Sequence, residues 1–143
     1  MSIVLGPRSI SRLQDVHPDL VRVVHRAAAM SDLDFTVLEG RRSLARQKQL
    51  MAQGATRTLN SRHLTGHAVD LAPMLDNVVR WDWSLYLKLA EIIRAAAAAE
   101  KVPVRWGGTW KLLSATQGPI TAKILSRSFP DGPHFELPRA NYP

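Results

Sequence analysis

Ten residues of the chain, SRHLTGHAVD, contain two histidines and one aspartate. Imidazole nitrogens and carboxylate oxygens are ligands for zinc and other divalent metals. If residues 68–71 form a strand entered through a turn at Gly66, His63 and Asp70 can point toward one spot. His67 is three residues from Asp70, so on an alternating strand its side chain faces the opposite way. The spacing therefore predicts a site that contains His63 and Asp70 and excludes His67.

A third ligand must come from elsewhere, because a catalytic zinc site usually takes three protein ligands and leaves one position for water. The chain has no cysteine and five histidines. Two of the other three, His17 and His25, lie among basic neighbours in a segment with helical character. His134 instead follows a turn, in FPDGPHFEL, and two carboxylates accompany it, Asp131 and Glu136. His134 is thus the best candidate for the third ligand.

The same two carboxylates are candidates for a general base. Strand alternation puts His134 and Glu136 on one face, which favours Glu136. The position of Asp131 in a turn would let its side chain reach around a metal. The residues alone leave both candidates open.

The surrounding segments predict the elements that hold these residues. We expect a helix over 84–101 with Ser84 as its N-cap, and a helix over 43–54 that Ser43 caps and Gly54 ends. Pro73 is expected to end the strand that carries Asp70. The full set of predicted elements is helices over 17–30, 43–54 and 84–101, and strands over 35–38, 68–73, 77–81, 104–106 and 134–137.

This order predicts a small single α+β domain over residues 1–143, with a mainly antiparallel sheet, helices packed on one side and a metal site at the sheet face. The chain has 143 residues, of which 45% are apolar, which suits one hydrophobic core. No apolar run approaches 18 residues, so no membrane-spanning helix is expected. The N-terminal residues lack the order of a secretory signal, which predicts synthesis in a cytoplasm.

The net charge of +7 favours association with polyanions such as nucleic acid, anionic lipid or an acidic cell envelope. The basic residues are scattered, however, and aromatic residues make up only 6% of the chain. A nucleic-acid-binding domain would need clustered basic residues and aromatic residues placed for stacking, so no nucleic acid is expected as a partner. A zinc-dependent binding module without catalysis is not favoured either, because such a module has no need of the carboxylate beside His134.

Three blocks, EGRRSLARQ, SRHLTGHAVDLAP and DGPHFEL, occur in this order between Phe35 and Leu137. The middle block fits S-x-H-x-x-G-x-x-x-D. The chain resembles the zinc peptidases that cut peptidoglycan stem peptides, which include D-alanyl-D-alanine carboxypeptidases and dipeptidases and the L-alanyl-D-glutamate endopeptidases of bacteriophages. Its compact size is most similar to a phage endolysin that acts on Gram-negative walls.

The resemblance implies Zn²⁺ as cofactor, with His63, Asp70 and His134 as its ligands. It also implies the general base, because the family's catalytic carboxylate lies three residues before the last histidine, at Asp131. We therefore prefer Asp131 to Glu136 for this role.

The resemblance implies three further site residues. The family's G-x-R element fits Gly40-Arg41-Arg42, so Arg42 would contact the substrate and the developing oxyanion. Gln47 matches a glutamine behind that arginine, and Ser61 matches the serine that opens the motif. Both would bind substrate.

The resemblance implies a lytic enzyme that hydrolyses the L-alanyl-D-glutamate bond, with stem peptides and an anionic envelope as partners. Such an enzyme would be a monomer made in the host cytoplasm, and would act in the periplasm after release. A D-alanyl-D-alanine carboxypeptidase or dipeptidase stays an alternative, since it needs the same zinc chemistry.

One departure from relatives is Thr109, where WGGTW replaces WGGDW. Trp106 and Trp110, on either side of it, belong either to the core or to a cleft wall. The segment 111–130 is long and is a candidate lid or substrate-facing loop.

Overall fold

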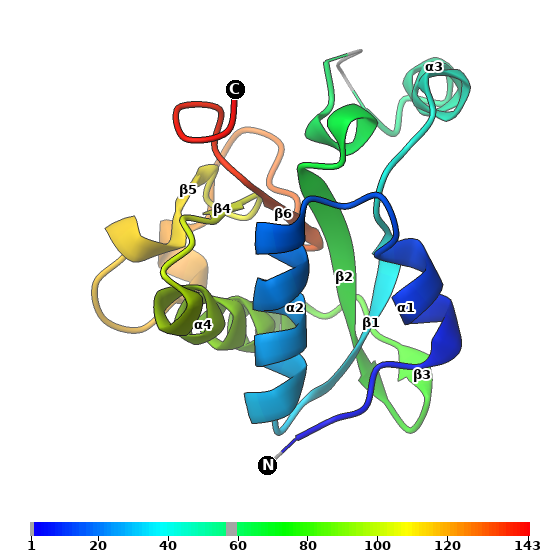
Figure 1. Ribbon diagram of the computed structural model, residues 1–143. Helices are drawn as coiled ribbons and strands as arrows, with labels where there is room; N and C mark the ends of the chain where they lie inside the picture. Colours follow the sequence, from blue (N-terminus) through cyan, green and yellow to red (C-terminus); the bar gives the residue numbers. More distant parts are fainter. Residues whose placement is uncertain (1, 57–59) are drawn as a thin grey trace.

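The computed structural model describes residues 2–56 and 60–143. Helices and strands follow one another along the chain without a regular βαβ order, which is typical of an α+β fold (Figure 1). The elements are α1 (Pro7–Arg12), α2 (Pro18–Met30), β1 (Asp34–Glu39), α3 (Leu44–Ala52), η1 (Arg62–Thr65), β2 (Ala68–Leu75), β3 (Val78–Val79), α4 (Trp83–Glu100), β4 (Arg105–Trp106), β5 (Lys111–Leu112), η2 (Leu113–Ala115), η3 (Ala122–Ile124) and β6 (His134–Glu136).

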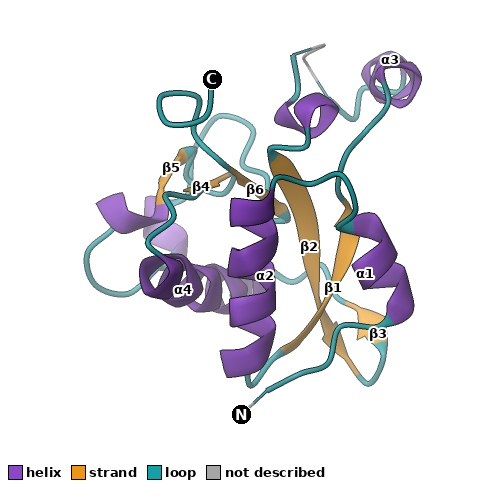
Figure 2. Ribbon diagram, in the orientation of Figure 1, coloured by secondary structure: helices purple, strands orange, loops and turns teal. Residues whose placement is uncertain are grey.

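The strands form one sheet in the order β1-β2-β6-β4-β5, with β3 paired to β2 (Figure 2). The strand pairs are antiparallel. In the central pair, Val69 lies opposite Phe135 and Asp70 lies opposite His134. Because side chains alternate between the two faces of a strand, Val69 and Phe135 enter the core while Asp70 and His134 share the other face. The antiparallel sheet with its helices, and the position of the candidate site at the sheet face, agree with the prediction.

The core lies between the sheet and the two long helices. In Figure 1 α2 lies beside β2, and α4 packs on α2 and runs behind it, below β4 in this view. The apolar residues of both helices recur at helical spacing and are almost fully buried. They include Leu20, Val23, Val24 and Ala27 of α2 and Leu89, Ile93, Ala96 and Ala97 of α4. Ala96 and Ala97 let the two helices approach closely, whereas Ala95, Ala98 and Ala99 of the same run are exposed.

Helix α1, which the sequence did not predict, lies beside the edge strand β1. The Val37 N–H donates to Ser9 Oγ at 3.0 Å, and Arg12 donates from Nη1 to the Val37 carbonyl at 2.9 Å. These contacts satisfy backbone groups that an edge strand leaves unpaired. Figure 1 shows α1 along this edge.

Two predicted boundaries were wrong, the end of the strand that carries Asp70 and the start of α4. The Asp70 strand continues through Pro73 to Leu75, because Pro73 serves there as an acceptor, for the Arg80 N–H at 2.9 Å. Helix α4 begins one residue earlier than predicted, and Asp82, not Ser84, is its N-cap.

Most other elements follow the prediction. Ser43 caps α3 by accepting from the Arg46 N–H, and Gly54 has a φ of 74° just after that helix. The strand expected over 77–81 shortens to Val78–Val79. Within the described part of the chain, every helix is too short or too polar to cross a membrane.

Candidate metal centre

Three separate elements bring the predicted ligands together. His63 comes from the turn η1, Asp70 from β2 and His134 from β6, and one ligand atom of each lies within 4.8 Å of the others. Asp70 Oδ1 is 3.1 Å from His63 Nε2 and 3.4 Å from His134 Nδ1. The cross-strand pairing of Asp70 with His134 fixes two of these side chains on one face of the sheet.

The turn that carries His63 is built by its neighbours. Ser61 caps η1 by accepting from the His63 N–H at 3.2 Å, and Gly66 ends it with a φ of 77°. A Cβ on Gly66 would lie 2.2 Å from the Asp15 carbonyl oxygen, so only glycine fits this position. Beyond the turn, the His67 ring packs against the rings of His17 and Tyr142 and lies outside the ligand cluster.

The outer nitrogens of both histidines have acceptors. His63 donates from Nδ1 to the Gly40 carbonyl at 2.8 Å, and His134 donates from Nε2 to Glu136 Oε1 at 2.7 Å. Metal-binding histidines almost always donate their second N–H to a carbonyl or a carboxylate, which fixes the ring and the tautomer. The nitrogens that face Asp70 are thereby left with lone pairs for a cation. This donor set fits zinc.

The charges of the site shift the pKa values of its groups. Burial alone would raise the pKa of Asp70, but His63 and His134 hold it well below its usual range. Burial would lower the pKa of His134, whereas hydrogen bonds to Asp70 and Glu136 raise it to about 9. Without a metal, Asp70 therefore attracts a proton to His134.

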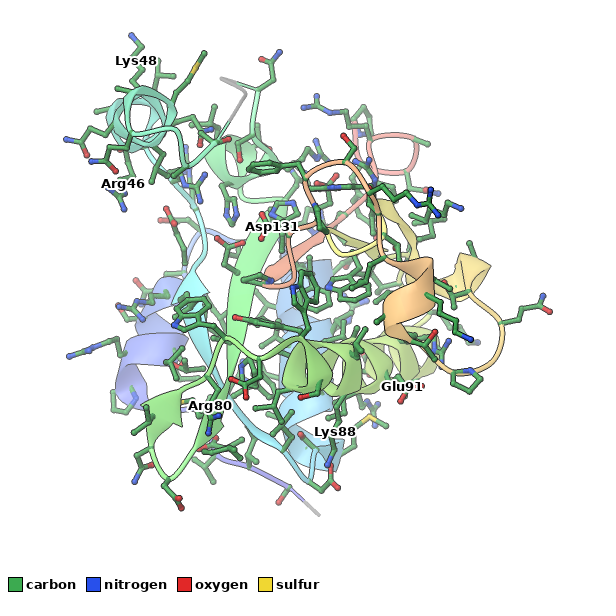
Figure 3. The ribbon with its side chains drawn as sticks, turned by 180° about the vertical axis from the view of Figure 1, so that it is seen from behind. Arg46, Lys48, Arg80, Lys88, Glu91 and Asp131 are labelled. Carbon is green, nitrogen blue, oxygen red and sulfur yellow. The ribbon has the colours of Figure 1, made fainter. Side chains whose placement is uncertain are left out.

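The centre opens into a cleft of about 500 Å³, on whose wall Asp131 lies. Figure 3 shows Asp131 over the middle of the molecule, beside the exposed side of the sheet. Its backbone N–H donates to the Gly107 carbonyl at 2.9 Å, and its carbonyl accepts from the His134 N–H at 3.3 Å. Burial and the nearby Asp70 carboxylate raise the pKa of Asp131. Asp131 thus lies beside the ligands without belonging to their cluster.

Arg42 lines the cleft but is only 9% exposed, and its donors are engaged. Its Nε and Nη2 bind the two oxygens of Glu39, at 2.7 Å and 2.9 Å. Its Nη1 donates to Gln47 Oε1 at 2.7 Å, and its Nη2 is 3.5 Å from Asp70 Oδ2. Gln47 is fully buried, so it lies behind the arginine as the resemblance implied, and contacts Arg42 instead of the cleft.

The two tryptophans of WGGTW have different positions. Trp106 is fully buried in the core, where its Nε1 donates to the Gly132 carbonyl at 2.8 Å. Trp110 lines the cleft and packs on the His134 ring, with centroids 5.4 Å apart. Thr109 accepts from the Lys111 N–H through its hydroxyl at 3.3 Å, which stabilises the turn between them.

The segment 111–130 is mostly attached to α4. Arg94 donates to the carbonyls of Thr116 and Gly118, and the Ile120 N–H donates to Glu91 Oε1. Only its end reaches the cleft, through Phe129. The segment therefore contributes a wall residue, and most of it packs as part of the body.

Sequence reasoning missed three groups of the site: the Glu39 carboxylate, the Gly40 carbonyl and Arg105. Glu39 is three residues from Arg42, a spacing that could have suggested an ion pair. The Gly40 carbonyl carries no side-chain signal. Arg105 reaches the cleft only through the pairing of β4 with β6, which the sequence does not display.

Comparison with known proteins identifies the family. The profile of phage L-alanyl-D-glutamate peptidases matches residues 1–138. The chain belongs to this family. It is 30% identical over 141 residues to the L-alanyl-D-glutamate peptidase of Escherichia phage T5, a match that covers 96% of this chain and 99% of that protein.

A solved structure agrees with this assignment. The crystal structure of the Serratia marcescens L-Ala D-Glu endopeptidase ChiX superposes with a TM-score of 0.80 at 42% sequence identity, covering 96% of this chain and 91% of that one. Both relatives match this chain over nearly its whole length. The α+β fold and the family assignment therefore cover all the elements that form the site.

Proposed function

We propose that this family member is a zinc-dependent peptidase that hydrolyses the L-alanyl-D-glutamate bond of peptidoglycan stem peptides, as a phage endolysin does. The observation that carries the proposal is the cluster of His63, Asp70 and His134, with ligand atoms within 4.8 Å of one another. The names of the phage T5 and Serratia relatives support the choice of bond.

Zinc suits the cluster because its donors are two imidazole nitrogens and one carboxylate oxygen, and because both outer histidine nitrogens have acceptors. Zinc bound there would act as a Lewis acid and lower the pKa of its bound water to about 7. The three side chains would hold the ion, and the cleft would admit the peptide.

Asp131 is our choice of general base. It would take a proton from the attacking water and then pass it to the leaving amine. Burial raises the pKa of Asp131. The raised pKa lies closer to the pKa values of the attacking water and the leaving amine, with which Asp131 would exchange protons. Glu136 is already bound to His134 and to Arg105, so we assign it to fixing the His134 ring.

Arg42 would stabilise the negative charge that develops on the carbonyl oxygen. Its hydrogen bonds to Glu39 and Gln47 hold the guanidinium at the edge of the cleft, which supports an electrostatic role in a fixed position. Ser61 lines the cleft. As the N-cap of η1 it would also hold His63 in position.

The setting of the reaction follows from the same proposal. The stem peptide would be met in the periplasm after release of the enzyme from the host cytoplasm, and the net charge of +7 would favour adsorption to the anionic envelope. We propose a monomer as the active form, because the ligands and Asp131 come from one chain.

Metal reconstitution tests the proposal. A chelator should abolish hydrolysis of purified stem peptides, and about one equivalent of zinc per chain should restore it. His63→Ala serves as the control and should stay inactive after zinc is added. Full activity of the chelated protein, or of the His63→Ala variant, would contradict the zinc mechanism.

A further inference from the structure

We infer that Arg105 binds the carboxylate beside the scissile bond and sets the preference of the site for an acidic substrate. This inference rests on the proposed function. The bond between L-alanine and D-glutamate has the free α-carboxylate of the glutamate one carbon from its nitrogen. A site that cuts this bond therefore has to accommodate a negative charge next to the reacting atoms.

Two other arginines of the cleft have their Nε and Nη2 donors engaged. Arg42 donates from Nε and Nη2 to Glu39 and from Nη1 to Gln47. Arg62 is 5% exposed and donates from Nε and Nη2 to the Leu137 carbonyl, and from Nη2 to the Tyr142 carbonyl. Arg42 therefore contributes a fixed positive charge and Arg62 supports the wall of the cleft, and in both the Nη2 group already has an acceptor.

Arg105 has a different environment. Its side chain is 40% exposed and lines the cleft. Its Nε donates to the Trp110 carbonyl at 2.9 Å and its Nη1 to Glu136 Oε2 at 3.3 Å, while the guanidinium lies 5.2 Å from the centre of the Trp110 ring. Among the described residues, Nη2 has no acceptor. These three contacts hold the guanidinium in place, and its Nη2 group keeps N–H donors for a ligand.

The position of Arg105 relative to the metal ligands fits a carboxylate next to the scissile nitrogen. Glu136 binds Arg105 with one oxygen and the ligand His134 with the other, at 3.3 Å and 2.7 Å. Trp110 likewise contacts both the Arg105 guanidinium and the His134 ring. Arg105 and His134 therefore share Glu136 and Trp110 as neighbours, which places the guanidinium beside the metal centre.

Arg139 is the matched control. It also lines the cleft and donates from Nη2 to the Asn60 carbonyl at 2.9 Å. It makes no described contact with a ligand or with Glu136.

The experiment compares two stem peptides that differ only in the α-carboxylate of the second residue, which is free in D-glutamate and an amide in D-isoglutamine. We measure kcat/KM on both for the zinc-loaded wild type, Arg105→Gln and Arg139→Gln. A charge-assisted hydrogen bond predicts that the wild type prefers the acid about 10- to 100-fold. Arg105→Gln should bring this preference close to one, and Arg139→Gln should retain it.

The ratio separates recognition from damage to the metal site. If Arg105 acts only by supporting Glu136, its replacement lowers both rates equally and the preference survives, which overturns the inference. Loss of the preference in Arg139→Gln alone, or a wild type that cuts both peptides equally, overturns it as well. A wild type that cleaves neither peptide at this bond overturns the proposed function and the inference together.

Discussion

Asp131 and Glu136 are two carboxylates of the same short segment with opposite surroundings. Glu136 is paired with His134 and Arg105, and these partners lower its pKa despite burial. Asp131 faces the cleft, and burial raises its pKa. An acid that shuttles a proton benefits from a raised pKa, whereas one that orients a ligand benefits from staying charged. This contrast supports different roles for the two residues.

Replacement of each carboxylate tests these roles. Asp131→Ala should lower kcat about 10²- to 10⁴-fold and leave the zinc content unchanged, because only proton transfer is lost. Glu136→Ala should weaken zinc binding about 10- to 100-fold, and added zinc should recover part of the activity. The measurements are steady-state kinetics and metal content. An active Asp131→Ala beside a zinc-loaded but inactive Glu136→Ala would reverse the assignment.

The raised pKa of His134 predicts that zinc binding depends on pH. Below a pKa of about 9 the metal-free histidine carries a proton, which zinc must displace. The apparent zinc affinity should therefore rise with pH between about 6 and 9, by up to about tenfold for each unit. Competition with a chelator of known affinity at several pH values measures it. An affinity that stays constant over this range would show that no proton leaves on binding.

At the level of elements, the turn before β6 connects Asp131, the proposed base, to His134, the proposed third ligand. Gly107 packs against this turn. A Cβ on Gly107 would lie 2.3 Å from the Asp131 carbonyl oxygen and 3.0 Å from the Cβ of His134. The turn and β4 are thus packed too closely for any side chain at this position.

Gly107→Ala should therefore destabilise the fold by about 1–3 kcal/mol and lower activity, because the added methyl group displaces Asp131 and His134. Thermal unfolding and kcat/KM measure both effects. Gly6→Ala is the control, since nothing lies within 4 Å of a Cβ built there. Wild-type activity in Gly107→Ala would mean that the turn tolerates this displacement.

The elements that the sequence predicted well are those with a local signal. The periodic helices α2 and α4, and the Ser43 cap of α3, depend on residues within one or two turns of each other. The short helix α1 was missed because its role is to satisfy β1, which lies more than twenty residues away. The pairing of β4 with β6, and with it the place of Arg105, is also a long-range property.

The site divides in the same way. The motif and its resemblance to a known family were sufficient to select His63, Asp70 and His134, and the structure brings them together. The partners of these ligands were not predictable, because a backbone carbonyl such as that of Gly40 has no signature in the sequence. Gln47 is fully buried against Arg42, and its role in substrate binding stays a prediction.

For the molecule as a whole, the net charge of +7 is spread over many elements. Figure 3 shows Arg46 and Lys48 projecting from α3, far from Arg80 and Lys88 at the other end of the view. Several basic residues are also paired, as Lys88 is with Asp32 and Arg80 with Asp82. The charge therefore acts as a general field more than as a patch for one ligand.

This distribution predicts that adsorption to purified anionic cell walls weakens as salt rises from about 0.05 M to about 0.5 M, because ions screen exposed charges. Cosedimentation at several salt concentrations measures it, and cleavage of a small neutral stem-peptide analogue provides the control that should change little. Wall binding that does not change with salt would show that the net charge does not drive adsorption.

The most direct measurement is mass spectrometry of purified muropeptides after digestion, with and without a chelator. The account predicts one new amine, that of D-glutamate, released from L-alanine only when the metal is present. Release of terminal D-alanine would instead assign the chain a D-alanyl-D-alanine specificity. Digestion that proceeds unchanged in the chelator would contradict a metal centre at His63, Asp70 and His134.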